Sequence, residues 1–383
     1  MATAHYNHAA ESNRHSASRL TPVDALRGLL MILMALDHVN WFVVRQHSTG
    51  EYWGGPFPVY HDALTFVTRL ATHFSAPGFF LLMGVGMALF AHSRRQQEWS
   101  DWSIVRHFLI RGSVLIALQL LAVNLAWTLS PGGWGVETYI GVLFALGSTM
   151  ILSSLLLRLK PAYLLMLTGA LVLGTEWLAP DPGQWGQAFA PLSRILLVPG
   201  GDGHLWVNYP VLPWLELVTF GMVLGHWLEA DRRRAYQRAL WLGAAFLIAF
   251  FAMRYLGGFG NLRPRAGNTW IDFLNPVKYP PSIAFTLLTT GVNLILLSWF
   301  GRMREGLQRL VQLLVVFGRQ PLFFYVTHLF VYAMLGLSLT PTGTSIPGMY
   351  PYWLLGLLVL YPMCLWYERL QHGSAERSLL RLL

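Results

Sequence analysis

The stretch from Asp24 to His38 carries ionisable side chains at both ends of an otherwise apolar segment. Asp24 and Arg27 stand near its start, Asp37 and His38 close it, and nothing polar lies between Arg27 and Asp37. In an α-helix Arg27 and His38 would share one face, roughly 16 Å apart along the axis. Ionisable groups inside lipid are costly, so the pattern predicts a functional site. A histidine there can take a proton from a hydroxyl or amine, with a carboxylate such as Asp37 to orient it.

The composition indicates the kind of molecule that must position this segment. Hydrophobic residues make up 54% of the 383 residues and charged residues only 12%, whereas soluble domains carry about 25% charge. Several apolar runs of about twenty residues predict an all-α, polytopic transmembrane helical bundle. The net charge of +9 comes from arginines clustered between apolar runs. That distribution is typical of membrane topology, so nucleic acid is not expected as a partner.

Cysteine and the termini limit the remaining options. Cys364 is the single cysteine and stands in an apolar run, so neither an internal disulfide nor a cysteine metal cluster can form, and no metal is expected. The polar residues 1–19 lack the apolar core of a secretory signal and are predicted to be a disordered cytoplasmic leader. Residues 20–383 are predicted to form a single transmembrane domain.

About ten spans are predicted, and their flanking charges set the orientation. Most Arg and Lys residues fall on one side, which places both termini in the cytoplasm. The protein is therefore expected in a membrane, with lipids as neighbours, most simply the bacterial inner membrane; a homodimer is left open. The predicted spans are 23–44, 62–92, 104–128, 137–157, 161–179, 209–229, 239–256, 281–300, 313–337 and 351–367.

The second span brings further histidines near the first. It is too long for one straight helix, and it follows His61 and contains His73. Pro77 has no N–H for the carbonyl of His73, which predicts a kink beside that imidazole. His73 suits either catalysis or a helix-packing hydrogen bond. His61 suits either catalysis or an ordinary interfacial position at a helix start.

Later segments add polar groups at comparable depths. Glu216 lies within a span and needs a partner or a water-filled cavity. Arg319 and His328 repeat the order of an arginine near the cytoplasm and a deeper histidine. The external loops at about 180–208 and 257–280 are rich in Trp, Pro, Gly and Asn. Such loops suit a sugar-like acceptor, although aromatic residues also form interfacial belts.

Five segments in this order resemble one family. The spacing from Arg27 to His38 is similar to the signature of the membrane acyltransferase-3 superfamily. The whole set resembles more closely the bacterial branch with a heparan-α-glucosaminide N-acetyltransferase-like catalytic domain (DUF1624-type). The segments are Val23–Gly28 through Asp37-His38, Thr68–Pro77 with Gly84, Leu212-Pro213-Trp214, Lys278–Ser282, and Gly318–Tyr325 with His328.

The resemblance implies an enzyme that moves acetyl groups from cytoplasmic acetyl-CoA to a glycan-type or other polar acceptor on the far side. In the lysosomal relative an asparagine and a loop histidine form the reactive pair, and the alignment puts His38 at the first and His61 at or near the second. His38 or His61 would then be the base, with His73 and Asp37 as supporting members. The remaining roles are donor binding by Arg27, Asp24 and Arg319, and acceptor binding by Lys278, Tyr279, Glu216 and His328.

A second class of function remains open from the residues alone. Buried histidines and arginines also form the proton relays of transporters and flippases. Many transporters show paired halves with broken helices in matching positions, and no full-length repeat of that kind is evident in this sequence. A purely structural membrane partner would leave the buried charges without a role.

Overall fold

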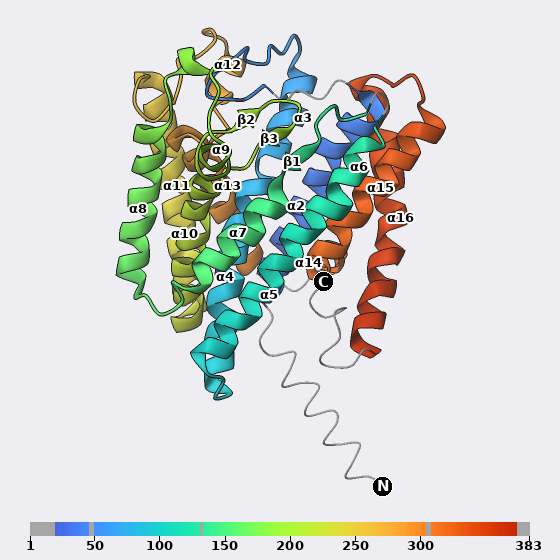
Figure 1. The fold of residues 1–383 in the computed structure, drawn as a ribbon. Coiled ribbons are helices and arrows are strands. Elements are labelled where there is room, and N and C mark those ends of the chain that lie inside the picture. The colour runs from blue at the N-terminus through green and yellow to red at the C-terminus, as the bar shows by residue number, and fades with distance from the viewer. Residues whose placement is uncertain (1–19, 46–49, 131–132, 304–307, 374–383) are drawn as a thin grey trace.

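The computed structural model describes residues 20–45, 50–130, 133–303 and 308–373 (Figure 1). Within these ranges nine helical segments are long and apolar enough to cross a membrane. The predicted all-α polytopic bundle is therefore confirmed, and the chain is an integral membrane protein. The predicted leader, residues 1–19, lies outside the described residues.

The long helices match nine of the ten predicted spans. Three are composite: α2 continues into the π-helix η1, α3 is followed at once by α4, and α5 passes through the π-helix η2 into α6. Their bounds are α2 (Thr21–Val39), η1 (Asn40–Val44), α3 (Ala63–His73), α4 (Ser75–Gln96), α5 (Asp101–Leu118), η2 (Gln119–Val123), α6 (Asn124–Thr128), α8 (Pro161–Leu178), α10 (Val211–Ala230), α11 (Arg232–Leu256), α13 (Ile283–Gly301), α15 (Pro321–Leu339) and α16 (Ile346–Gly373). The shorter elements are β1 (Thr138–Ile140), α7 (Val142–Ser154), η3 (Pro182–Gln184), α9 (Pro191–Leu196), β2 (Gly200–Gly201), β3 (Leu205–Val207), α12 (Trp270–Leu274) and α14 (Gln308–Arg319).

The predicted span 137–157 differs from the structure. Its first residues form β1, which pairs in parallel with β3, and β2 pairs with β3 from the other side. The helix that follows, α7, has only 13 residues, fewer than the roughly 20 that cross a bilayer. An apolar run can form a strand as readily as a helix when a partner strand is near, and this one finds its partner in β3.

Proline stands at two of the helix breaks, the first of them predicted. α3 ends at His73 and α4 begins at Ser75, just before Pro77. Similarly, α14 ends at Arg319 and α15 begins at Pro321. Proline has no N–H to donate to the preceding turn, so the regular helix is interrupted at both places. The predicted division of the long second span is confirmed.

The centre of the bundle is formed by α2, α4 and α10. The most apolar stretch of each span is 67% buried in the span that contains α2, 72% in the span that contains α4 and 83% in α10. The corresponding stretch of α8 is only 11% buried. Glycine lets central helices cross closely. A Cβ on Gly84 of α4 would lie 2.1 Å from the carbonyl oxygen of Val218 in α10. A Cβ on Gly318 of α14 would lie 1.8 Å from the carbonyl oxygen of Asp24 in α2.

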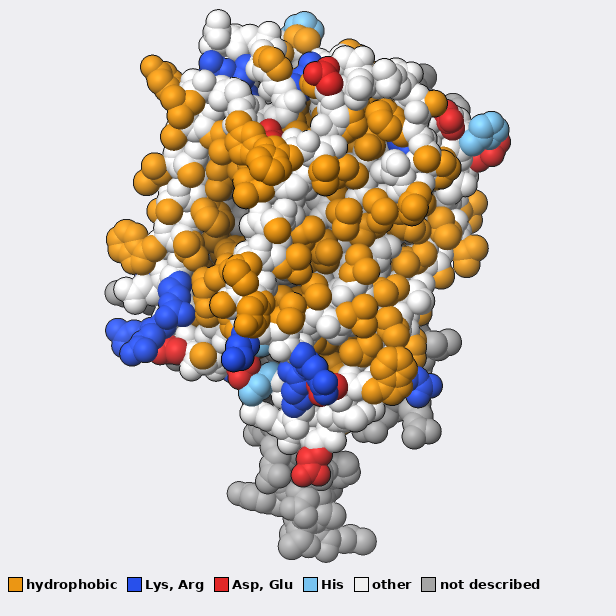
Figure 2. All heavy atoms as spheres, turned by 60° about the vertical axis from the view of Figure 1, so that its left-hand side comes forward, with side chains coloured by type: hydrophobic (Ala, Val, Ile, Leu, Met, Phe, Trp, Pro, Cys, Tyr) orange, Lys and Arg blue, Asp and Glu red, His pale blue; other side chains and the backbone are white. Residues whose placement is uncertain are grey.

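The two ends of the bundle differ in charge. A wide hydrophobic belt covers the middle of the molecule, and Lys and Arg side chains gather below it (Figure 2). We call this lower end, where α4 ends with Arg94 and Arg95 and α11 begins with Arg232, the basic end. The opposite end, which carries the small sheet and α12, is the loop end (Figure 1). Helix α2 begins at the basic end, and η1 finishes at the loop end.

Candidate functional site

Two histidines from distant parts of the chain meet inside the bundle. His38 Nδ1 of α2 lies 2.6 Å from His328 Nε2 of α15. The rings stack with centroids 4.9 Å apart, and His328 is completely buried. On its other side, His328 Nδ1 donates to the carbonyl oxygen of Phe324, at 2.9 Å. We call His38 and His328 the histidine pair.

These contacts assign the protons of the neutral histidine pair. The carbonyl of Phe324 can only accept, so the proton of His328 is on Nδ1 and its Nε2 carries a lone pair. His38 Nδ1 must then donate to that Nε2. Neutral His38 therefore keeps its own lone pair on Nε2. That tautomer suits a general base, with a second imidazole behind it to share the incoming charge.

Aromatic rings enclose the exposed side of the pair. The edge of Trp127, from α6, meets His38 with centroids 5.4 Å apart. Tyr325, from α15, meets it from another direction at 6.4 Å. The His38 residue still keeps 9% of its surface accessible. The histidine pair is thus a basic group in largely aromatic surroundings, with little exposure to solvent.

Next to His38 along the chain, a buried charge cluster surrounds Arg69. Arg69 Nη1 donates to Asp37 Oδ1 at 2.5 Å. Arg69 also binds both carboxylate oxygens of Glu51, with Nε and Nη2 each at 2.8 Å. Arg69 is 3% exposed and Glu51 is completely buried. A bidentate pair of this kind fixes orientation as well as charge.

Other side chains complete this cluster and tie together three parts of the chain. Thr72 donates to Asp37 at 2.9 Å, and Tyr60 donates to Glu51 at 3.0 Å. His73 Nε2 lies 3.4 Å from Glu51 Oε1. The cluster, defined as Asp37, Glu51, Arg69, Thr72 and His73, joins α2, α3 and the loop between them.

The backbone of Glu51 binds the segment before α13. The amides of Lys278 and Tyr279 both donate to the carbonyl oxygen of Glu51 at 3.0 Å, and the amide of Trp53 donates back to Tyr279 at 2.9 Å. Lys278 is 3% exposed and Tyr279 is 5% exposed. Two of the four predicted acceptor-binding residues, Lys278 and Tyr279, therefore lie beneath the loop that carries Glu51, beside the charge cluster.

The loop groups of the cluster are electrostatically coupled. Burial alone would raise the pKa of Glu51, but the guanidinium of Arg69 and its hydrogen bonds hold that pKa well below the ordinary value. Burial, with a smaller contribution from the charge of Arg69, lowers the pKa of Lys278 to about 8. Glu51 is therefore a carboxylate throughout the physiological range, and Lys278 titrates near its upper edge.

At the basic end, the predicted donor-binding residues lie together. Arg27 Nη1 contacts Asp24 Oδ1 at 2.8 Å and the carbonyl oxygen of Gly318 at 3.0 Å. The next residue, Arg319, pairs with Glu368 of α16 at 3.3 Å. The side chain of Arg27 is 21% exposed and that of Arg319 40%. The junction of α2 and α14 thus presents two accessible guanidinium groups.

Two predicted site residues make their contacts away from the histidine pair. His61 is exposed at the loop end, next to Asp62, whose side chain caps α3 by accepting from the amide of Thr65. Glu216 is buried in α10, where its carboxylate accepts from the hydroxyl of Thr286 at 2.7 Å. Glu216 thereby obtains the partner that an intramembrane carboxylate requires.

Glu51 was missed by the sequence reasoning, and Arg69 was given no role there. Arg69 offered a signal, because an arginine within an apolar span needs a carboxylate close by. Its two partners come from the preceding helix and from a loop, and a loop has no period from which contacts can be inferred.

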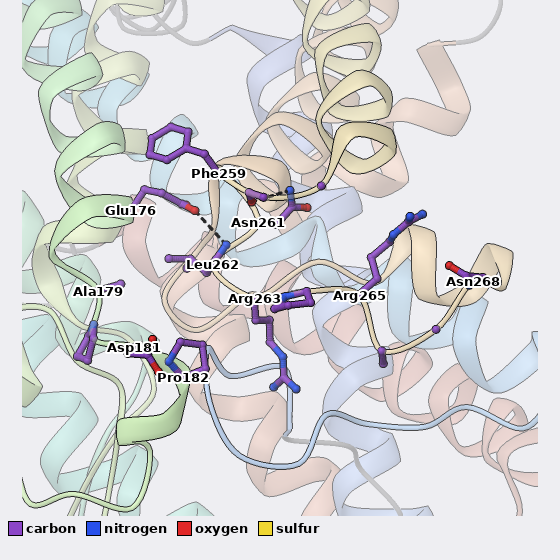
Figure 3. Close-up of a pocket in the computed structure, with 16 residues that line it drawn as sticks. Glu176, Ala179, Asp181, Pro182, Phe259, Asn261, Leu262, Arg263, Arg265 and Asn268 are labelled. Atoms are coloured by element: carbon purple, nitrogen blue, oxygen red, sulfur yellow. Dashed lines mark hydrogen bonds between the residues drawn. The ribbon is translucent and has the colours of Figure 1, made fainter.

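A surface pocket of about 760 Å³ lies at the loop end between the region after α8 and the loop before α12. Glu176 accepts from the amide of Leu262 at 3.0 Å, and the Arg263 side chain points toward the loop after η1 (Figure 3). There Arg263 donates to the carbonyl oxygens of Tyr52 and Gly55. Arg263 therefore braces the outer loops, and the pocket lining includes none of the predicted site residues.

Spanning helices around buried ionisable groups define a polytopic membrane protein with a polar site inside its bundle. Residues 19–256 match the family model described as heparan-alpha-glucosaminide N-acetyltransferase, catalytic. The chain belongs to this family of membrane acetyltransferases, and the resemblance inferred from the motifs is confirmed.

A curated relative with the same description is the heparan-alpha-glucosaminide N-acetyltransferase of Mus musculus. It is 29% identical over 146 residues, which cover 38% of this chain and 20% of the mouse protein. The chain thus spans about a fifth of the length of that relative. The family match includes His38 and the charge cluster, whereas Arg319 and His328 follow it in the chain.

Proposed function

We propose that this protein transfers an acetyl group from acetyl-CoA, bound at the basic end, to a hydroxyl or amino group of a glycan-type or other polar acceptor that enters from the loop end. The basic end would face the cytoplasm, across a bacterial inner membrane. The observation that carries the proposal is the histidine pair, in which the 2.6 Å contact to His328 leaves the lone pair of neutral His38 on Nε2.

In the proposed reaction His38 Nε2 takes the proton of the acceptor hydroxyl or amine. The acceptor oxygen or nitrogen forms a bond to the carbonyl carbon of the acetyl group, and the carbon–sulfur bond of the thioester breaks. The proton then passes to the sulfur of the departing CoA. His328 stabilises the transient positive charge, because its Nε2 accepts the hydrogen bond from His38 Nδ1.

The donor side of the proposal rests on the two arginines at the basic end. A guanidinium offers several donors in a planar fork, which fits phosphate oxygens of CoA. Nη1 of Arg27 donates to Asp24 and to the carbonyl of Gly318, so the side chain is oriented before the donor arrives. Arg319, which follows Gly318 in the chain, adds a second cation.

Among the candidate bases, His38 is favoured over His73 and His61. His38 has a tautomer set by its partner and lies between the aromatic rings of Trp127 and Tyr325. His73 lies within the charge cluster, with its Nε2 3.4 Å from the carboxylate of Glu51. His61 lies exposed at the start of α3. In this proposal Asp37 and His73 support the site, and only His38 abstracts the proton.

The test is the thermal stability of the purified, detergent-solubilised protein with and without acetyl-CoA. A ligand that binds only the folded state raises the melting temperature by mass action. We expect acetyl-CoA to stabilise the wild type and His38→Ala, and to lose this effect in Arg27→Ala. The matched control is Arg158→Ala, another arginine near the basic end, whose side chain is 75% exposed and pairs with Asp101.

The outcomes separate the enzyme from the transporter. A folded wild type that ignores millimolar acetyl-CoA contradicts the proposal and directs attention to proton-coupled transport. Stabilisation that disappears equally in Arg158→Ala indicates only general attraction between a basic surface and an anion. With an acceptor in hand, His38→Ala should lower turnover by about 10²–10⁴-fold, the usual contribution of a general base.

A further inference from the structure

Two tryptophans in contact with each other lead away from His38, and the first of them, Trp127, touches it. Trp127, in α6, is 7% exposed, and its ring contacts both His38 and Trp134, with centroids 5.4 and 5.1 Å apart. Trp134 follows α6 in the connection toward β1 and also meets Tyr139, at 4.9 Å. The two indoles form a continuous aromatic surface that begins at the candidate base, and we call it the tryptophan platform.

Both indole nitrogens of the platform are buried, and neither has a hydrogen-bond partner within the part of the chain that the structure describes. An indole N–H can only donate, and an unpaired buried donor is costly in free energy. Trp206 and Trp353 avoid this cost, since Trp206 donates to Asn208 and Trp353 to the carbonyl of Ile32.

Trp53 and Trp214 also have unpaired buried indole nitrogens. Their ring contacts are with aromatic residues such as Trp185 and Phe80. The platform is distinguished by the fact that its two indole rings contact each other and that the ring of Trp127 also contacts His38.

The backbone is irregular on both sides of the contact between His38 and Trp127. The π-helix η1 starts two residues after His38, and the π-helix η2 ends four residues before Trp127. Such turns are uncommon and occur frequently at functional sites. The second one is held in place by the buried Gln119, which accepts from the amide of Leu143 and donates to the carbonyl of Tyr139. The irregularity is thus built into the packing at this place.

We propose that the tryptophan platform binds an uncharged sugar-type ring of the acceptor and presents its reacting group to His38 Nε2. The proposal rests on the acetyltransferase function and names the acceptor-binding residues for it. A flat aromatic surface can pack against the apolar face of a ring, while the indole N–H groups donate to ring oxygens. The rings that contact the platform are Trp41, Phe42, Tyr139 and His38, none of which is a permanent charge. A neutral ring therefore fits better than an anionic one.

The experiment measures binding of three probes to the full-length protein in detergent by tryptophan fluorescence and thermal stability. The probes are methyl glucoside, which is neutral, methyl glucosaminide, which is cationic, and glucuronate, which is anionic. We expect methyl glucoside to bind at least about tenfold more tightly than glucuronate. Trp127→Phe and Trp134→Phe keep an aromatic ring but remove the indole N–H together with part of the ring surface. Each should weaken methyl glucoside binding by at least about fivefold to tenfold, the worth of one hydrogen bond.

The control is Trp177→Phe, because that side chain is 81% exposed on α8, and it should bind all three probes like the wild type. A structural defect would weaken sugar and acetyl-CoA binding together, whereas the platform variants should keep the stabilisation by acetyl-CoA. If acetyl-CoA stabilises the wild type while none of the sugars binds, or while both phenylalanine variants bind them unchanged, the platform is wrong and the acetyltransferase proposal stands. If acetyl-CoA itself fails, the proposed function is wrong.

Discussion

Each end of α2 has an aspartate that pairs with an arginine, but the two pairs lie in very different surroundings. At the loop end, Asp37 meets Arg69, which is 3% exposed and also holds the buried Glu51. At the basic end, Asp24 meets Arg27, which is 21% exposed and braced by one carbonyl of α14. In the first pair every charge already has its partner inside the protein. In the second, guanidinium donors remain accessible, as binding of an anionic donor from water requires.

This contrast teaches what each end contributes. Buried charges that are mutually satisfied hold a structure in one arrangement, and breaking them leaves an uncompensated charge in a medium of low dielectric constant. Accessible ion pairs contribute little to stability because water screens them. We therefore expect the loop end to determine stability and the basic end to determine donor binding.

The largest effect is expected for Arg69→Met. The substitution leaves the buried Glu51 and the partly exposed Asp37 without their cation, which should cost about 3–5 kcal/mol of unfolding free energy. Chemical unfolding in detergent measures it. Adding Glu51→Gln to that variant should cost less than the sum of the two single changes, because one uncompensated charge is removed. A single variant as stable as the wild type would show that the cluster does not hold the loop end.

Gly318→Ala tests the crossing that positions the basic end. Its Cβ would lie 1.8 Å from the carbonyl oxygen of Asp24, which is backbone and cannot move aside. We expect a loss of about 1–3 kcal/mol, together with weaker stabilisation by acetyl-CoA. The control is Gly86→Ala in α4, where a Cβ meets nothing within 4 Å. This substitution should increase the free energy of unfolding by up to about 1 kcal/mol. Equal effects of the two changes would mean that the close crossing is unimportant.

Lys278 gives the loop end a pH dependence. Its pKa is lowered by burial to about 8, against 10.5 for the ordinary amine that it regains on unfolding. Between these values the unfolded state binds more protons, so the folded state gains stability as the pH rises. Relative to Lys278→Met, the wild type should gain about 1–3 kcal/mol from pH 7.5 to 10.5. Parallel stability curves for the two proteins would contradict the shift.

The smallest effect on stability is expected for Arg319→Ala. Its pair with Glu368 is 3.3 Å long, and the arginine side chain is 40% exposed. Removing such a pair should change the unfolding free energy by about 1 kcal/mol or less. Stabilisation by acetyl-CoA should nevertheless fall, which a titration against melting temperature would detect. A large loss of stability with unchanged acetyl-CoA binding would reverse the proposed division between the two ends.

Local chemistry explains what could be predicted from the sequence. The membrane helices followed from apolar length, and the break before Pro77 followed from the missing N–H of proline. The run that contains β1 was misjudged because its partner strand is more than sixty residues away in the chain. An apolar segment of that length does not reveal such a partner.

The site required contacts that the sequence does not contain. His38 and His328 were each identified as buried histidines, but their contact spans 290 residues and depends on how α2 packs against α15. Glu51 stands in a loop, so its role emerged only when the fold brought it to Arg69. The types of residue that the chemistry needs were therefore predictable, and their partners were not.

The contacts of Glu51 affect the route by which acceptor and product could enter and leave the site. Its carboxylate holds Arg69 while its carbonyl accepts from both Lys278 and Tyr279. Moving this loop outward would break all of these hydrogen bonds together, so the loop is poorly suited to open and close during turnover. We expect acceptor and product to exchange by the side where Trp127 and Trp134 lie, with the loop of Glu51 remaining shut through each catalytic cycle.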